Sequence, residues 1–193
     1  SKPQLIISGT VQTLDGTKAA VDFDGTNDAI WLDSVFPDIV LNNISVFCVA
    51  KYDTVPTTPS ECLYSLGWTA GSGRFFMQNW SSSGYEYGYY FGYAGTWNAL
   101  TGGPAADTSK HLFSAIAGST QGYFEAWVDT TSMGSPATLS SNTTSGTYGL
   151  GGVNSVTDYA FDGKMSEFIL YQSDESSGAT SIRSNINSYY TLY

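Results

Sequence analysis

Residues 19–32 read AAVDFDGTNDAIWL, in which two short apolar runs flank the pair Asp24-Gly25. Glycine takes a positive φ without a steric cost, so an Asp-Gly pair between such runs is a strong signal of a tight turn. The stretch therefore predicts a strand, a turn and a second strand. The same punctuation occurs at Ser8-Gly9 and Asp15-Gly16, and we expect residues 1–33 to form a series of short extended pieces.

Further runs rich in β-branched and aromatic residues follow along the chain. They occupy residues 44–52, 62–66, 73–80, 85–94, 110–117, 122–129 and 164–172. Strands at such spacing, without helices between them, are typical of a sandwich or a barrel. The Gly-, Ser- and Thr-rich segments 95–109 and 130–147 lack periodicity, and we expect them to be long surface loops.

One helix is expected near the end of the sequence. Apolar residues recur there at three- and four-residue steps: Ala179, Ile182, Ile186 and Tyr189. Such a stripe packs against a sheet, and Asp174, Ser176 and Ser177 are candidate caps for the helix N-terminus. The prediction is an all-β chain, a two-sheet antiparallel sandwich with a short C-terminal helix, in which residues 1–193 form a single domain.

The composition excludes several classes of function. The 193 residues carry 7 Lys and Arg against 17 Asp and Glu, a formal net charge of −10. Such a surface repels phosphate backbones, so we expect no nucleic-acid binding. No apolar run approaches the roughly 20 residues that span a bilayer, and no membrane insertion is expected. No basic and apolar leader opens the sequence, so no secretory signal peptide is visible.

Two segments resemble the concanavalin A-like, laminin-G-like jelly-roll family. The first is an F-D-G-x-x-D turn at residues 23–28, and the second is the strand pattern FDGKMSEFILY at residues 161–171. In addition, residues 2–28 and 181–193 look like the C-terminal domains of bacteriophage tail, fibre and head-decoration proteins. The resemblance implies a jelly roll that binds host glycan or a neighbouring virion protein at the virion surface. It also implies a structural calcium ion and a parent protein that forms a homo-oligomer.

Acidic residues gather at both of these turns. Calcium binds oxygen ligands on flexible loops, so Asp24, Asp28 and Asp162 are candidate ligands for an ion that joins the two turns. The alternative is that the Asp side chains accept hydrogen bonds from nearby backbone amides, as is common in Asp-Gly turns.

The tyrosine-rich run at 85–93, YEYGYYFGY, divides into two faces. Alternation places five rings on one face and the set Glu86, Gly88, Tyr90 and Gly92 on the other. The five-ring face is either a glycan platform or part of the core. We favour the core, which leaves Glu86 and Tyr90 as candidate ligand-binding residues beside small glycines.

Tryptophans at expected strand ends and loops, beside small polar residues, are further candidates for sugar binding. They are Trp68, Trp80 and Trp97, the last followed by Asn98. Sugars stack on aromatic rings, and neighbouring polar groups bind their hydroxyls. The alternative is that each indole folds back over an end of the sandwich.

Catalytic and redox chemistry receive little support from the sequence. Retaining glycosidases need two carboxyl groups about 5 Å apart, whereas Glu125 and Asp129 would lie roughly 13 Å apart on one strand. His111, the only histidine, is expected to bond to a turn at the start of a strand. We therefore predict a non-enzymatic module, with a purely structural decoration or capping role without sugar binding as the first alternative and a polysaccharide-cleaving enzyme as the second. Cys48 and Cys62 form either a disulfide or two reduced core thiols.

Overall fold

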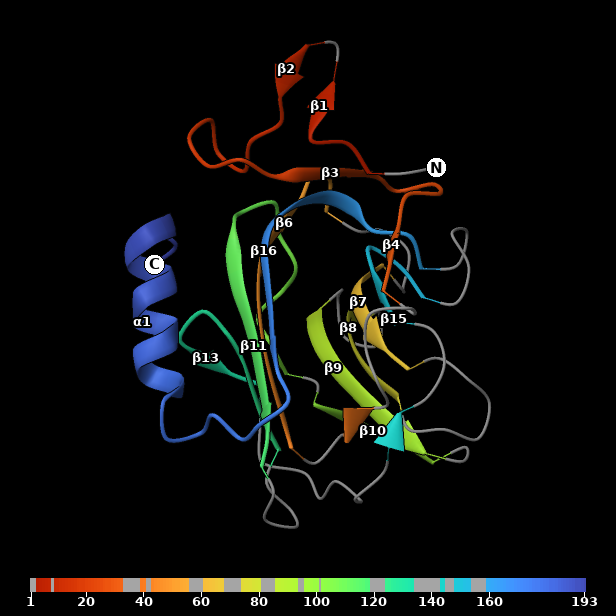
Figure 1. The fold of residues 1–193 in the computed structure, drawn as a ribbon, viewed down its shortest axis with the longest axis vertical. Helices are drawn as coiled ribbons and strands as arrows, with labels where there is room; N and C mark the ends of the chain where they lie inside the picture. The colour runs from red at the N-terminus through yellow and green to blue at the C-terminus, as the bar shows by residue number, and fades with distance from the viewer. Residues whose placement is uncertain are drawn as a thin grey trace.

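Two six-stranded antiparallel sheets stack face to face, and one helix covers the outer side of one of them (Figure 1). The computed structural model describes residues 3–7, 9–32, 39–40, 43–55, 61–67, 74–80, 86–93, 96–100, 102–118, 124–133, 143–144, 148–153 and 159–193. The all-β antiparallel sandwich with a C-terminal helix, predicted from strand spacing, is confirmed.

The sheet beneath the helix is called the back sheet. Its strands, in spatial order, are β13 (Thr131–Ser132), β12 (Phe124–Val128), β11 (His111–Ala117), β6 (Ile44–Tyr52), β16 (Asp162–Tyr171) and β3 (Val21–Asp24). The other sheet is called the front sheet. Its order is β10 (Thr96–Leu100), β9 (Glu86–Tyr93), β8 (Arg74–Trp80), β7 (Cys62–Leu66), β15 (Tyr148–Leu150) and β4 (Ile30–Trp31).

Two small sheets and the helix α1 (Ala179–Tyr190) complete the described elements. The small sheets pair β1 (Ile6–Ile7) with β2 (Thr10–Val11), and β5 (Ile39–Val40) with β14 (Thr143–Thr144). The turns expected from the sequence are present, because Gly9, Gly16 and Gly25 have φ angles of 79°, 88° and 67°. No described helix has the length and apolar character needed to cross a membrane.

The main core lies between the two sheets and is unusually rich in tyrosine. Tyr52, Tyr64, Tyr87 and Tyr89 are all fully buried in it. For Tyr87 and Tyr89, this confirms the core interpretation of the tyrosine-rich run. Strand β12 alternates in the same way, since Phe124, Ala126 and Val128 enter the same core.

A second apolar cluster fills the space between the back sheet and α1. Phe47 and Val49 of β6 pack there against Ala179 and Ile186 of the helix. Strand β6 is therefore buried on both faces, and only Lys51 is partly exposed. The helix supplies the partner for the second face of this strand.

A β-bulge in β16 changes which residues face the core. The pairing of β16 with β6 shifts register between Met165 and Glu167, so Ser166 is the extra residue. Met165 and Phe168, three positions apart, consequently both pack on the main core. A bulge inserts one residue into one strand and reverses the alternation beyond it.

Several expectations about boundaries were wrong. Residues 96–100 form an edge strand, β10, in a segment expected to be a loop, because hydrogen bonds to β9 order the backbone. Short strands β13 and β14 likewise interrupt the expected loop at 130–147. Strand β12 ends at Val128, because Asp129 takes a positive φ of 54°.

The helix differs from expectation at both ends. Its N-cap is Gly178, and no side chain caps it, because Asp174 instead accepts a hydrogen bond from the amide of Ser176. Tyr189 is 61% exposed, and its neighbour Tyr190 is the ring that packs against the sheet. Cys48 and Cys62 are buried free thiols, as in the reduced alternative, and burial raises the pKa of both.

Candidate functional site

The front sheet has an outward face that follows from its register. Tyr87 and Tyr89 point into the core, so alternation puts the positions between and beside them on the outward face. One line of paired residues crosses all six strands on this face. We call it the outward row, and it runs Ala99, Tyr90, Phe76, Ser65, Gly149 and Trp31.

The register brings together most of the predicted ligand-binding positions. Trp80 pairs directly with Glu86, and both positions share the outward face with Tyr90. Trp97 pairs with Gly92 and lies on the same face. Trp80 ends β8, within the strand expected at residues 73–80, whereas Trp97 is a strand residue in a segment that we expected to be a loop.

Two predicted ligand positions do not join this group. Asn98 pairs with Phe91 and alternates with Trp97, so it belongs to the opposite face of β10. Trp68 lies outside the described residues. Positions 97 and 98, adjacent in the sequence, therefore belong to opposite faces of β10.

Trp31 is a member of the outward row that our sequence reasoning missed. It is half-buried, and a Cβ atom at Gly149 would lie 2.5 Å from Cζ3 of its indole ring. The indole thus occupies the space that a side chain at position 149 would fill. Beside it, the Ser65 hydroxyl is buried and donates to the carbonyl of Gly152 over 3.2 Å. Alternation in the sequence could have identified Trp31 as an outward residue, because its neighbours Ile30 and Leu32 both pack on the core.

The acidic turns are organised mainly by backbone hydrogen bonds. Asp24 and Asp162 lie opposite each other in the ladder between β3 and β16. The Asp24 carboxylate accepts from the amides of Asn27 (3.1 Å) and Thr26 (2.9 Å). The hydrogen bond from the Asn27 amide is the main cause that lowers the pKa of Asp24.

The other two candidate calcium ligands also have protein partners. Asp28 accepts from the amide of Asp24, and Asp162 accepts from the hydroxyl of Thr54 over 3.0 Å. Within the described part of the chain, no three His, Cys, Asp or Glu side chains are grouped so as to hold a metal ion. Calcium binding stays a prediction, which calorimetry after chelation tests.

His111 begins β11 and lies between two carboxylates, as the turn-bonded interpretation predicted. Its Nδ1 atom is 2.6 Å from Asp129 and its Nε2 atom is 3.0 Å from Asp107. Asp129 also accepts from the amide of Leu112 over 2.9 Å. Both imidazole nitrogens are thus engaged by carboxylates, and neither is available to activate a serine hydroxyl.

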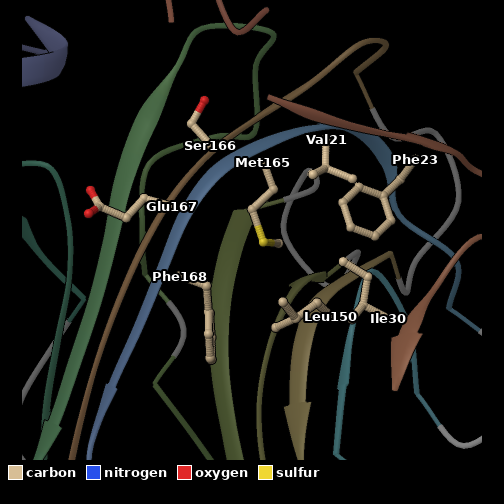
Figure 2. A pocket seen from close by; sticks show the side chains of 8 residues that line it. All are labelled: Val21, Phe23, Ile30, Leu150, Met165, Ser166, Glu167 and Phe168. Atoms are coloured by element: carbon tan, nitrogen blue, oxygen red, sulfur yellow. The ribbon is translucent and has the colours of Figure 1, made fainter. Parts of the chain in front are cut away.

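An apolar slot opens between the sheets beside the β16 bulge (Figure 2). Its volume is about 120 Å³, and its apolar lining comes from Val21, Phe23, Ile30, Leu150, Met165 and Phe168. Ser166 and Glu167 point away from this apolar group (Figure 2). Ligand pockets combine apolar walls with converging polar groups and are usually larger, so this slot is best explained as loose packing where the sheets separate.

Comparison with known proteins defines the fold further. No protein-family model matches the sequence, and no characterised protein matches it by sequence. Similar solved structures include the SAP-like pentraxin from Limulus polyphemus (TM-score 0.58, 11% identity, 83% of this chain and 78% of the pentraxin). A mutant NanB sialidase from Streptococcus pneumoniae is also similar (TM-score 0.57, 15% identity, 84% of this chain and 27% of the sialidase).

A third similar structure contains a sugar. It is domain 4 of AbnA, a GH43 extracellular arabinanase from Geobacillus stearothermophilus, in complex with arabinotriose. It has a TM-score of 0.53 and 17% identity, and the match covers 84% of this chain and 80% of that domain. At such identities the likeness shows the jelly-roll fold alone. The chain spans about a quarter of the sialidase, at 27% of its length.

Proposed function

We propose that this domain binds carbohydrate and that the glycan stacks on aromatic positions of the outward face of the front sheet. The observation that carries the proposal is the outward row, in which the register sets the aromatic positions 31, 76 and 90 in one line across the sheet. Sugar rings present C–H faces that stack on aromatic side chains. Ser65 and Gly149, which separate position 76 from Trp31 in the row, are buried, so the stacking surface is the aromatic positions and not the whole row.

Trp31 is the described side chain that best fits this role. Gly149 leaves room for the indole to lie on the backbone of β15, so the ring is supported from one side. Rigid aromatic groups lose little conformational entropy when a ligand stacks on them. The predicted positions Trp80, Glu86 and Trp97 extend the same face toward β10.

The fold comparison supports the same class of function. A domain of similar length and fold has been solved with arabinotriose, and this chain matches 80% of it. Fold alone does not define a ligand, so the proposal of carbohydrate binding rests on the outward row, and the fold comparison adds support to it.

A pair of variants tests the proposal. Wild-type protein is screened on a glycan array, and the best polysaccharide is then used in affinity electrophoresis. Trp31→Ala should weaken binding by about five-fold or more, because one stacked ring contributes on the order of 1 kcal/mol. Tyr189→Ala, which removes a 61% exposed ring from the helix on the other side of the sandwich, is the matched control and should bind normally. Binding that survives Trp31→Ala, or no glycan hit, would contradict the proposal.

We further propose that the module is non-enzymatic. Asp129, one of the two carboxylates considered for catalysis, is held by His111 and by the amide of Leu112. A carboxylate with both oxygens engaged in this way is poorly placed to attack a sugar or to activate water. Release of reducing ends from the bound polysaccharide by purified protein would contradict this part of the proposal.

The setting that we propose is the surface of a virion, within an oligomeric parent protein. It is supported by the resemblance of residues 2–28 and 181–193 to bacteriophage tail, fibre and decoration domains. Flanking tail or capsid sequence in the full-length gene product is the expected result. If the domain assembles into particles through a neighbouring virion protein and binds no glycan, the structural role replaces the recognition role.

A further inference from the structure

A polar groove lies between the end of β12 and the helix α1, on the outer side of the back sheet. Its volume is about 280 Å³. The side chains on which the argument depends are those of Trp127, Thr130, Thr180, Arg183, Ser184 and Tyr193. Since α1 covers the back sheet and the outward row is on the front sheet, the groove and the outward row are on opposite sides of the sandwich (Figure 1).

Arg183 is the cation of this groove, and it has an unusual environment. Its guanidinium carbon lies 4.3 Å from the centroid of the Trp127 ring, close enough for a cation–π contact. Among the described residues, the ion pairs with carboxylates involve Lys51, Lys110, His111 and Lys164, and none involves Arg183. In a protein with 17 acidic residues, an arginine that is stacked on tryptophan and has no carboxylate partner among the described residues can receive an anionic ligand.

Two other polar side chains that line the groove are already hydrogen-bonded within the protein. Asp129 is bonded to His111 and to the amide of Leu112. Asn187 accepts from the amides of Leu192 and Tyr193 and donates to the carbonyl of Tyr193. The Asp129 carboxylate is therefore engaged by protein groups, and the Asn187 side chain is part of the wall of the groove and not a free ligand group.

The remaining lining is rich in hydroxyl groups. Thr180, Arg183, Ser184 and Asn187 follow each other at helical spacing, so they form one face of α1. Thr130 completes the opposite wall from the turn after β12. Hydroxyl groups both donate and accept hydrogen bonds, which matches the hydroxyl groups of a sugar.

We propose that this groove is a second ligand site that binds a carboxylate-bearing sugar, such as a uronic acid residue. The planar fork of the Arg183 guanidinium pairs with the sugar carboxylate through two parallel hydrogen bonds, a geometry that arginine favours. The threonine and serine hydroxyl groups bind the ring hydroxyls. A volume of about 280 Å³ is just below the range of pockets for drug-sized ligands, which suits one sugar residue and not a long chain.

The test is an NMR titration of the isotope-labelled protein with glucuronic acid, glucose and acetate. Glucuronic acid should shift the backbone amides of Thr130 and Thr180 and the indole N–H of Trp127 in a saturable way. Glucose lacks the carboxylate and acetate lacks the ring, so each should bind about ten-fold more weakly or not at all. Arg183→Gln should weaken glucuronic acid binding about ten-fold, since a charge-assisted bidentate pair is lost.

Lys18→Gln is the matched control for the removed charge. The Lys18 ammonium lies 3.6 Å from the centroid of the Tyr189 ring, so it is also a cation on an aromatic ring of α1, and it does not line the groove. This variant should bind glucuronic acid like the wild type. Equal loss in both variants, equal binding of glucose or acetate, or no shift at Trp127 would overturn the proposal. Trp31→Ala should leave this titration unchanged, so failure of the outward row and failure of this groove are distinguishable.

Discussion

His111 and Asp129 form a close pair across the back sheet, with Nδ1 of the imidazole 2.6 Å from Oδ2 of the carboxylate. Asp107 approaches the other ring nitrogen, and the edge of the Tyr87 ring packs against the imidazole. This arrangement ties the start of β11 to the turn after β12. The charge of His111 also changes with pH, and the direction of its pKa shift gives the sign of the effect on stability.

The first prediction concerns that pH dependence. Burial alone would lower the pKa of His111, but the hydrogen bonds and charges of Asp129 and Asp107 outweigh it and raise the pKa. Because the pKa of His111 is higher in the folded protein than in the unfolded chain, protonation of the imidazole stabilises the fold. This stabilisation is complete below about pH 6.5, the unfolded-state pKa, and is lost as the pH rises through the folded-state pKa. Because the chain has one histidine, its ring signal in NMR gives the pKa directly. A value above that of the urea-unfolded protein is expected, and a lower value would contradict the prediction.

The second prediction concerns Glu61, which accepts a hydrogen bond from the amide of Asp162. Burial, helped by the charge of Asp162, raises the pKa of Glu61 to about 7. The folded state then binds more protons than the unfolded state from about pH 4.5 to 7, so stability falls across that window. Glu61→Gln should flatten the melting temperature over this range and raise it at pH 8. An unchanged pH profile in the variant would show that another group is responsible.

The third prediction compares two tyrosines whose rings stack with centroids 6.0 Å apart. The Tyr87 hydroxyl donates to the carbonyl of Asp107 and accepts from its amide, whereas the buried Tyr52 hydroxyl has no partner among the described residues. Tyr87→Phe should lower the free energy of unfolding by about 1–2 kcal/mol, because it leaves polar groups unpaired. Tyr52→Phe should change it little or raise it by up to about 1 kcal/mol. Urea unfolding measures both, and a larger loss in Tyr52→Phe would refute the comparison.

The fourth prediction concerns two glycines with similar backbone angles and different surroundings. Gly151 and Gly16 have φ angles of 81° and 88°. A Cβ atom at Gly151 would lie 2.3 Å from the buried Phe23 ring, whereas one at Gly16 would meet nothing within 4 Å. Gly16→Ala should therefore cost only the backbone strain, about 1 kcal/mol, and Gly151→Ala about 3 kcal/mol or more. Equal losses in urea unfolding would mean that the core moves aside to admit the methyl group.

Strands and turns were predictable because their signals are local. Each strand from residue 44 to 66 has the predicted bounds, and the predicted glycine turns have positive φ. The strand β10 was missed because its order comes from pairing with β9, which no local pattern reports. The Ser166 bulge was missed for a similar reason, since it depends on how β16 fits against β6.

The candidate site was predictable only in part. Alternation correctly assigned Tyr87 and Tyr89 to the core, and the strand register places positions 86 and 90 on the other face of β9. The row that joins Tyr90 to Trp31 could not be derived, because cross-strand register depends on the whole sheet. The groove was missed because Trp127 and Arg183 are far apart in sequence and meet only when α1 packs on the back sheet.

The ladder between β3 and β16 joins the early and late parts of the chain, with Asp24 opposite Asp162. Strand β16 also covers one side of β6, the long central strand of the back sheet. A polypeptide that stops before residue 162 therefore leaves β6 as an open edge, with backbone groups ready to pair with another molecule. Synthesis must be nearly complete before this sheet can close, so premature termination of translation should yield chains that aggregate instead of folding.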